Sequence, residues 1–339
     1  MKHKATNLWR QGHSAFVKAF VMGCMLAFLA YAGDGTAADT SEAKHPAANA
    51  TGTVVVAIVN GEAILEGELN AGLPRTWLGL GATDTTIKAA KYERLISAAV
   101  VRQFLARSKI TVSNDTVTAE IEALRKTPPA AGCSCCRYAS LEQFMRDQGY
   151  DMDELRRAIV NDIGMNKYLT AEWDKNSLGV EKASDQVEAR VRSEYVKASH
   201  IFFNTFQKPD FQENPDKVLD VAWSNARDAQ QRLARGEKFE DVAATMSDDA
   251  MSNTKGGLLG CIPRNAFGSA FSSAVDDLKP GKSSKPIETQ WGIHIIRRET
   301  MTDADILKII RDEYVADNME TTLRRLLDAA KVERLWRPK

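Results

Sequence analysis

Two segments rich in β-branched and aromatic residues bracket residues 198–297, and they constrain this chain more than any other feature. The first reads A-S-H-I-F-F and the second reads T-Q-W-G-I-H-I-I. Residues of these types favour strands. The only two histidines beyond Pro46, His200 and His294, lie one in each segment. We therefore expect a module that begins and ends on a histidine-bearing strand.

The balance of charge excludes one broad class of partner. Lysine plus arginine and aspartate plus glutamate both number 45, so the formal net charge is zero. A chain without a net basic field does not attract nucleic acid. We therefore expect no nucleic-acid partner. The 339 residues leave room for two domains and a sizeable core.

The first 38 residues are typical of an export signal. Basic residues precede an apolar run from Ala19 to Ala32, and small residues follow it to Ala38. The run has 14 residues, whereas a bilayer span needs about 20. We expect a cleaved signal peptide over residues 1–38 and a flexible leader over residues 39–53. The mature protein would then lie in the periplasm or cell envelope. The alternative is an uncleaved signal that anchors the protein at the inner membrane.

Residues 54–190 read as a hairpin followed by helices. Val54–Val59 and Ala63–Leu65 flank Asn60-Gly61, the strongest short hairpin signal. Apolar residues then recur at helical spacing, and capping boxes at Ser140 and Asp151 open two helices. The helices are expected at residues 86–108, from Ser113 to before Pro128, at 141–148 and at 152–175. The buried stripe of the last helix is expected to be Leu155, Ile159, Ile163 and Tyr168.

Residues 303–336 carry a further amphipathic helix that is too polar to stand alone. The motif V-N-G-E-A-I at the hairpin, and the order of short helix, G-Y turn and long helix, resemble exported chaperones of the SurA and PrsA type. This resemblance implies that residues 54–190 form a SurA-like helical domain. It also implies that residues 303–336 return to pack on that domain, so that both ends of the chain build one lobe.

Four further motifs lie between the two histidines. They are G-E-K-F-E-D-V-A-A-T-M-S-D-D, K-G-G-L-L-G, A-F-G-S-A-F and L-K-P-G-K-S-S-K-P-I-E-T. Their order and spacing resemble the parvulin, or PpiC-type, family of peptidyl-prolyl cis/trans isomerases over residues 195–300. The resemblance implies an α+β fold in which a small mixed sheet is surrounded by helices, beside the helical lobe. It also implies isomerase activity without a cofactor, on unfolded or nascent exported polypeptides that contain X-Pro.

The same resemblance identifies the site residues. The polar group that it implies to be catalytic is His200, Asp249, Thr289 and His294. The wall of the proline pocket that it implies is Leu259, Phe267 and Phe271. Two neutral imidazoles flanked by a carboxylate and a hydroxyl can satisfy one another's hydrogen bonds. The alternative interpretation is that paired buried histidines are satisfied core groups that only fix the register of the strands.

Isomerisation of an X-Pro bond breaks no covalent bond. The uncatalysed event crosses about 18–20 kcal/mol of lost amide resonance. A catalyst has only to hold the proline ring, exclude water and favour the twisted amide over the planar one. An apolar pocket suits that task.

Three positions depart from the parvulin pattern. Leu258 replaces an acidic residue after the glycine pair, Cys261 replaces an aromatic residue, and Phe267 stands where many members carry methionine. The changes at Leu258 and Cys261 bear on turnover more than on the fold. They leave open a second interpretation, a chaperone whose parvulin module is weakly active or inactive.

Three cysteines, Cys133, Cys135 and Cys136, lie close together before the capping box at Ser140. In an exported protein the expected state is a disulfide, for example between Cys133 and Cys136. The alternative is a thiolate site for Cu(I) or zinc, to which Cys261 could add a ligand. The cluster therefore supports a third interpretation, a factor that handles thiols or metal.

Overall fold

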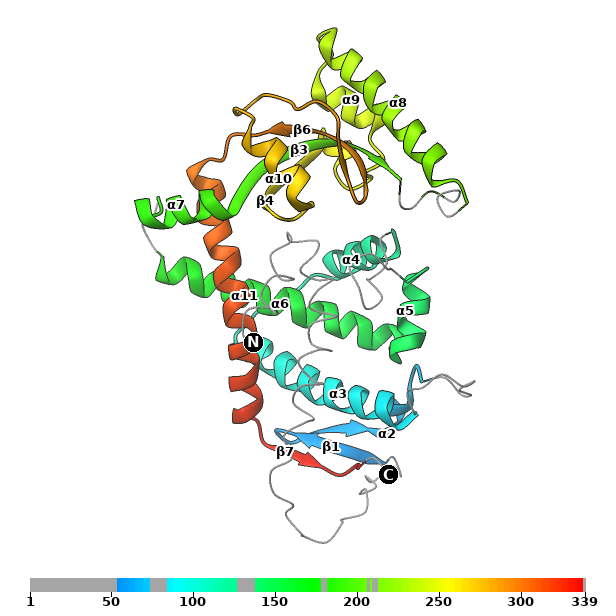
Figure 1. Ribbon diagram of the computed structural model, residues 1–339. Helices are drawn as coiled ribbons and strands as arrows, with labels where there is room; N and C mark the ends of the chain where they lie inside the picture. The colour runs from blue at the N-terminus through cyan, green and yellow to red at the C-terminus, as the bar shows by residue number, and fades with distance from the viewer. Residues whose placement is uncertain are drawn as a thin grey trace. The chain divides into compact units, whose positions relative to one another are not determined.

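The computed structural model describes residues 54–73, 84–126, 138–177, 182–205, 208 and 213–337. The expected signal peptide, the leader and the cysteine cluster lie outside these ranges. Helices and small sheets coexist, so the α+β class is confirmed (Figure 1). Contacts divide the described residues into two compact units. We call residues 54–177 with 314–337 the scaffold unit, and residues 182–313 the central unit.

The scaffold unit contains a three-stranded sheet in the order β2-β1-β7. The strands are β1 (Val55–Val59), β2 (Glu62–Leu65) and β7 (Val332–Arg334). β1 and β2 pair antiparallel, and the residues between them, Asn60 and Gly61, have φ angles of 50° and 90°. Asn-Gly favours such left-handed pairs in two-residue hairpins. The hairpin prediction is confirmed.

Five helices follow the hairpin within the described part of this unit. They are α2 (Glu66–Asn70), α3 (Asp84–Arg107), α4 (Asn114–Lys126), α5 (Leu141–Gln148) and α6 (Met152–Asn176). The side chains of Ser140 and Asp151 accept hydrogen bonds from the backbone amides of Gln143 and Glu154. Each bond satisfies an amide that the first turn leaves without a helical partner. The predicted starts of α5 and α6 are thus confirmed.

The end of the chain completes the core of the scaffold unit. Val56, Tyr92 and Ile96 belong to one buried cluster, and Leu326, Leu327 and Trp336 pack against it, among others. The Tyr92 and Trp336 rings lie 5.0 Å apart. The Tyr92 hydroxyl donates to the Val56 carbonyl at 3.0 Å. Residues 326–336 therefore pack on β1 and α3.

Helix α11 (Asp303–Ala329) differs from the expectation for residues 303–336. It ends at Ala329 because the following residues form β7, which pairs antiparallel with β1. Its first turns belong to the central unit, where Ile306 and Ile309 pack with Val191 and Tyr195. Helix α7 (Asp185–Glu194) also belongs to the central unit rather than to the helical lobe.

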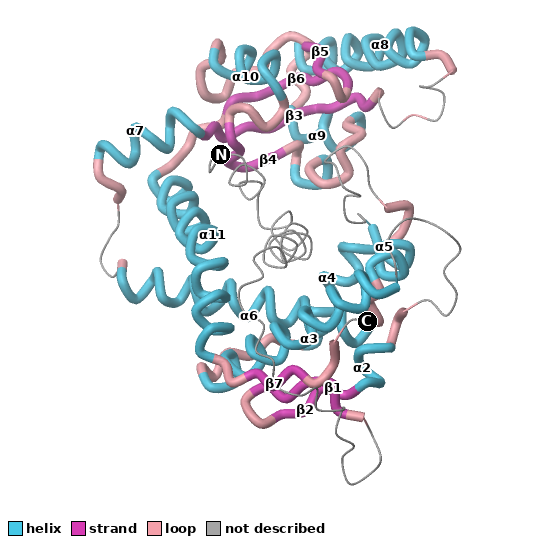
Figure 2. Tube along the Cα trace, turned by 60° about the horizontal axis from the view of Figure 1, so that its bottom comes forward, coloured by secondary structure: helices cyan, strands magenta, loops and turns pink. Residues whose placement is uncertain are grey.

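The central unit is built on a four-stranded sheet in the order β4-β3-β6-β5 (Figure 2). The strands are β3 (Tyr195–Asn204), β4 (Leu258–Pro263), β5 (Ile287–Thr289) and β6 (Gly292–Arg298). Every neighbouring pair is antiparallel, so the expected mixed sheet is wrong. Only two residues separate β5 from β6, and a parallel pair needs a crossover of about a dozen residues or more.

Helices cover both faces of this sheet. Helices α8 (Pro215–Ala234) and α9 (Phe239–Met246) pack with Ile201 and Phe203 on one face. Helix α10 (Gly268–Asp276) supplies Phe271 and Val275 to a cluster with Val196, Ala198 and Ile296 on the other. Within the described ranges, no helix is both long and apolar enough to cross a bilayer.

Candidate active site

The two histidines lie on the central strands of the four-stranded sheet. β3 and β6 pair antiparallel, with His200 opposite Ile296 and His294 opposite Phe202. Since side chains alternate along a strand, this register puts both imidazoles on the same face as diagonal neighbours. They are 2% and 1% exposed. The two bracketing strands therefore bring the histidines together, as the resemblance to parvulins implies for this pair.

Two glycines in the predicted motifs allow the strands to approach the site. Gly257 has a φ angle of 79°, and its carbonyl accepts a hydrogen bond from the His200 amide at 2.8 Å. A Cβ atom there would lie 2.4 Å from the His200 carbonyl oxygen. At Gly292 a Cβ atom would lie 2.1 Å from the Phe203 carbonyl oxygen. Both positions therefore require glycine, which accounts for part of the K-G-G and W-G-I-H motifs.

A continuous chain of hydrogen bonds links the four predicted polar residues. His200 Nε2 lies 3.0 Å from Asp249 Oδ2, and His200 Nδ1 lies 3.2 Å from His294 Nδ1. His294 Nε2 lies 2.9 Å from the Thr289 hydroxyl. Ser252 extends the chain at the other end by donating its hydroxyl to Asp249 Oδ2. We call these five residues the polar chain.

The electrostatics fix the charge at two positions of the polar chain. Burial alone would raise the pKa of Asp249, but hydrogen bonds from His200 and Ser252 outweigh burial and lower this pKa to about 2. Burial lowers the pKa of His294 well below its usual range, and the charge of His200 acts in the same direction. At neutral pH Asp249 is therefore a carboxylate and His294 is a neutral imidazole.

These charges determine the direction of the hydrogen bonds. The carboxylate of Asp249 can only accept, so Nε2 of His200 donates to it. The neutral imidazole of His294 has one donor and one acceptor nitrogen, and these meet Nδ1 of His200 and the Thr289 hydroxyl. Every ring nitrogen has a hydrogen-bond partner, and these bonds replace the bonds to water that burial of the two rings removes.

An aromatic cluster surrounds His294. It comprises Phe202, Phe267, Phe271 and Trp291. Phe202 and Phe271 have ring centroids 4.6 and 5.7 Å from that of His294, and Phe267 lies 4.8 Å from Phe271 and 6.0 Å from Trp291. Phe267 and Trp291 are partly exposed. The cluster therefore exposes an apolar surface to solvent beside the polar chain.

The predicted wall residues differ in their accessibility. Leu259 and Phe267 are partly buried and pack against the cluster that contains Phe271. Phe271 itself is fully buried. Leu259 and Phe267 can thus contact a ligand directly, whereas Phe271 supports them from beneath.

The sequence reasoning missed Ser252 and Trp291 as members of the site. Ser252 is 2% exposed, and it follows Asp249 by three residues in a turn where its amide also donates to the Asp249 carbonyl. A serine at that spacing from an aspartate is a recognisable turn signal. Trp291 lies within the T-Q-W-G motif, yet only the tertiary contact with Phe267 relates it to the site.

The described residues offer little to hold a metal ion. No three His, Cys, Asp or Glu side chains among them are grouped as ligands. Cys261 is partly buried, and burial raises its pKa to about 11. Since the thiolate is the form that binds metals, this protonated thiol is a poor candidate for the fourth ligand considered from the sequence.

The comparisons with known proteins agree with this geometry. Residues 200–300 match the family model for the rotamase domain of the PPIC-type PPIase. The foldase protein PrsA of Clostridium botulinum is 28% identical over 198 residues, which cover 56% of each chain. The chaperone SurA of Nitrosococcus oceani is 37% identical over 112 residues, which cover 30% of this chain and 26% of that protein.

The chain spans about half the length of its PrsA relative and about a quarter of its SurA relative. Among solved structures, PrsA from Bacillus subtilis aligns with a TM-score of 0.44 at 21% identity, and the alignment covers 81% of this chain and 90% of that one. The family match contains both histidines, the second half of β3, all of β6 and the whole polar chain. Residues 200–300 of this chain therefore match the rotamase domain of the PpiC-type, or parvulin, family.

Proposed function

We propose that this protein is a peptidyl-prolyl cis/trans isomerase that assists the folding of exported polypeptides. The observation that carries the proposal is the polar chain, whose two histidines lie buried beside the partly exposed rings of Phe267 and Trp291. The names of the relatives, a foldase and a chaperone, support a role in folding.

The apolar side chains suit the binding of a proline ring. Phe267, Leu259 and Trp291 present partly exposed apolar surface, and aromatic rings bury large areas against such a ligand. Contact with them removes water from the X-Pro amide. A twisted amide has lost its resonance and is less polar than the planar form, so a less polar environment favours the twisted state.

The polar chain gives the site a fixed shape and one accessible charge. The Asp249 side chain is 22% exposed, whereas that of His200 is 3% exposed. We therefore assign the histidines a positioning role, because they connect Asp249 at one end to Thr289 at the other without reaching solvent. Asp249 is the member placed to interact with a bound peptide.

We expect Asp249→Asn to lower turnover while the protein stays folded. In the wild type His200 and Ser252 both donate to Oδ2 of Asp249, and the Met251 amide donates to Oδ1. Asparagine has only one acceptor oxygen, so it cannot accept on both sides, and it removes the charge. A lost hydrogen bond to a charged group corresponds to about a ten- to hundredfold change in rate. Protease-coupled isomerisation of an X-Pro peptide measures the rate, and circular dichroism checks the fold.

Asp248→Asn is the matched control for this prediction. Asp248 is the adjacent residue and carries the same charge, but it bonds to the Asn204 amide and pairs with Lys208 instead of joining the polar chain. Its variant should keep the turnover of the wild type. If the folded wild-type protein does not accelerate isomerisation, the proposed activity is wrong and a binding module is left. Equal losses in both variants would refute the role of Asp249.

Export with cleavage of the N-terminal signal belongs to the same proposal. It rests on the basic start and on the short apolar run from Ala19 to Ala32. We expect the mature chain, recovered outside the cytoplasm, to begin beyond that run. Intact-mass measurement of the exported protein decides the matter, since a chain that retains Met1 and fractionates with membranes would instead indicate an anchor.

A further inference from the structure

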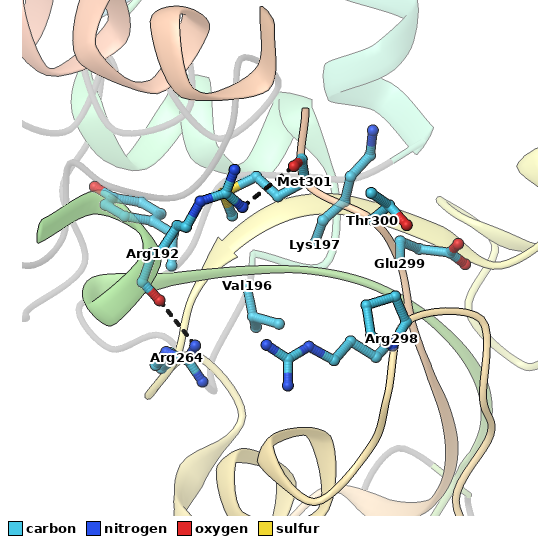
Figure 3. Close-up of a pocket in the computed structure, with 10 residues that line it drawn as sticks. Arg192, Val196, Lys197, Arg264, Arg298, Glu299, Thr300 and Met301 are labelled. Carbon is cyan, nitrogen blue, oxygen red and sulfur yellow. Dashed lines mark hydrogen bonds between the residues drawn. The ribbon is translucent and has the colours of Figure 1, made fainter. Parts of the chain in front are cut away.

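A small pocket lies in the central unit where β3 begins and β6 ends (Figure 3). Its volume is about 120 Å³. Val196, Tyr195 and Met301 line it and are nearly inaccessible to solvent. Arg298, the last residue of β6, follows His294 by four positions, a rise of about 13 Å. The pocket is therefore distinct from the polar chain.

The charged residues around the pocket are mostly cationic. They are Arg192, Lys197, Arg264, Arg298 and Glu299. The carboxylate of Glu299 accepts hydrogen bonds from Arg297 at 2.7 Å and from Ser199 at 2.6 Å. Glu299 is therefore paired with Arg297, which does not line the pocket and which also pairs with Glu240.

Three of the four cations have carboxylate partners of their own. The pairs are Arg192 with Glu188, Lys197 with Asp305, and Arg264 with Asp276. Arg298 is the exception, because no carboxylate in the described part of the chain pairs with it. Among the described residues, the Arg298 guanidinium is thus the one cation of the pocket lining without a carboxylate partner.

The Arg298 side chain is held in place by two backbone carbonyls. Its Nη1 donates to the carbonyls of Leu278 at 3.0 Å and Asp276 at 3.3 Å. The other guanidinium nitrogens, Nε and Nη2, have no hydrogen-bond partner among the described residues. An arginine that is anchored through one nitrogen keeps its remaining donors ready for a ligand.

A second arginine faces this guanidinium. Arg298 and Arg264 extend toward each other beneath Val196 (Figure 3). Burial lowers the pKa of Arg264, and the charge of Arg298 lowers it further. Two like charges that approach over an apolar floor repel each other, and an anion between them would relieve that repulsion.

We propose that this pocket binds a carboxylate group of a polypeptide, with Arg298 as the anchor and Arg264 beside it. The Arg298 guanidinium has only backbone carbonyls as partners among the described residues, and its planar fork matches the two oxygens of a carboxylate. The apolar floor suits the carbon stem of an acidic side chain or the residue that bears a chain end. The protein would thus hold acidic segments of a client at a second point, whether or not isomerisation takes place.

Proline-free peptides test this site independently of the proposed isomerase activity. The first probe is an N-acetylated and C-amidated alanine peptide that contains glutamate, and the second is an N-acetylated alanine peptide with a free C-terminal carboxylate. The third has neither charge and serves as the reference. Titration calorimetry with the full mature chain at low salt measures the dissociation constants. We expect at least one charged probe to bind about tenfold more tightly than the reference, and the stronger one identifies the source of the carboxylate.

The residue assignment is tested with Arg298→Gln. This variant should lose the preference for the charged probe, whereas Arg227→Gln, which removes the same charge from an exposed position on α8, should keep it. If Arg298→Gln does not fold, Arg298→Lys replaces it, because it retains the charge but loses the planar fork and should bind more weakly. Equal binding of all three probes by the wild type, or an unchanged preference in a folded Arg298 variant, would overturn the proposal.

Discussion

Phe271→Ala is expected to cost about 3–5 kcal/mol of unfolding free energy and, in the fraction that stays folded, most of the turnover. Phe271 is fully buried in the cluster with Val275 and Ile296, so its truncation leaves a cavity. Its ring also lies 4.8 Å from that of Phe267 and 5.7 Å from that of His294. Loss of the ring therefore removes the support beneath the apolar surface of the site. Urea unfolding and the X-Pro turnover assay measure the two effects.

Phe239→Ala separates the effect on the site from the effect on stability. Phe239 is a buried phenylalanine of α9 on the opposite face of the same sheet, packed with Ile201 and Phe203. Its truncation should destabilise the protein by a similar amount and leave turnover per folded molecule near that of the wild type. If both variants lose the same turnover per folded molecule, Phe271 acts only through the stability of the fold.

Local patterns in the sequence predicted the features of the fold that depend on neighbouring residues. The Asn60-Gly61 hairpin and the caps at Ser140 and Asp151 are set by backbone conformations that these residue types prefer. The two histidine strands follow in the same way from their residue types. Predicting these two strands also predicted the centre of the candidate site, because His200 and His294 meet once β3 pairs with β6.

Features that depend on distant contacts could not be predicted. β7 is a strand only because Val332–Arg334 meet β1, more than 270 positions earlier in the chain. The sequence could not show that Phe271 is fully buried while Phe267 is partly exposed, since both belong to the same A-F-G-S-A-F motif. The lack of a carboxylate partner for Arg298 among the described residues emerges only when the pairing of every neighbouring cation is known.

The buried face of α6 shows the same limit. Apolar spacing predicted a stripe through Leu155, Ile159, Ile163 and Tyr168. Leu155 and Ile159 are fully buried, but Ile163 and Tyr168 are only partly buried. Asp162 is fully buried instead. No rule of hydrophobic periodicity places a carboxyl group there, since carboxylates are almost never fully buried without a partner.

The surroundings of Asp162 favour its protonated form. Its Oδ2 has no hydrogen-bond partner within the described part of the structure. Its Oδ1 lies 3.4 Å from the side-chain amide nitrogen, Nδ2, of Asn166. Burial, and to a lesser extent the charge of Glu120, raises the pKa of Asp162 from 3.8 to about 7. In the unfolded chain the same group ionises near its ordinary value.

This shift makes the stability of the scaffold unit depend on pH. Because the folded state holds the proton more tightly, the contribution of Asp162 is fully present below about pH 4 and is lost as the pH rises through about 7. A shift of about three pKa units corresponds to at most about 4 kcal/mol. The protein should therefore be less stable at pH 8 than at pH 4.5 on account of this one group.

Asp162→Asn should remove this dependence, because asparagine resembles the protonated acid in shape and is neutral at every pH. We expect the variant to be more stable than the wild type at pH 8 and the difference to shrink toward zero near pH 4. Urea unfolding of both proteins at pH 4.5, 6 and 8 measures it, with Asp174→Asn, an exposed aspartate of the same helix, as the control for lost charge. A constant difference across this range, or the same pH response in the control, would show that the Asp162 carboxyl is not protonated in the folded protein, and that α6 accommodates a buried charge by contacts other than those described.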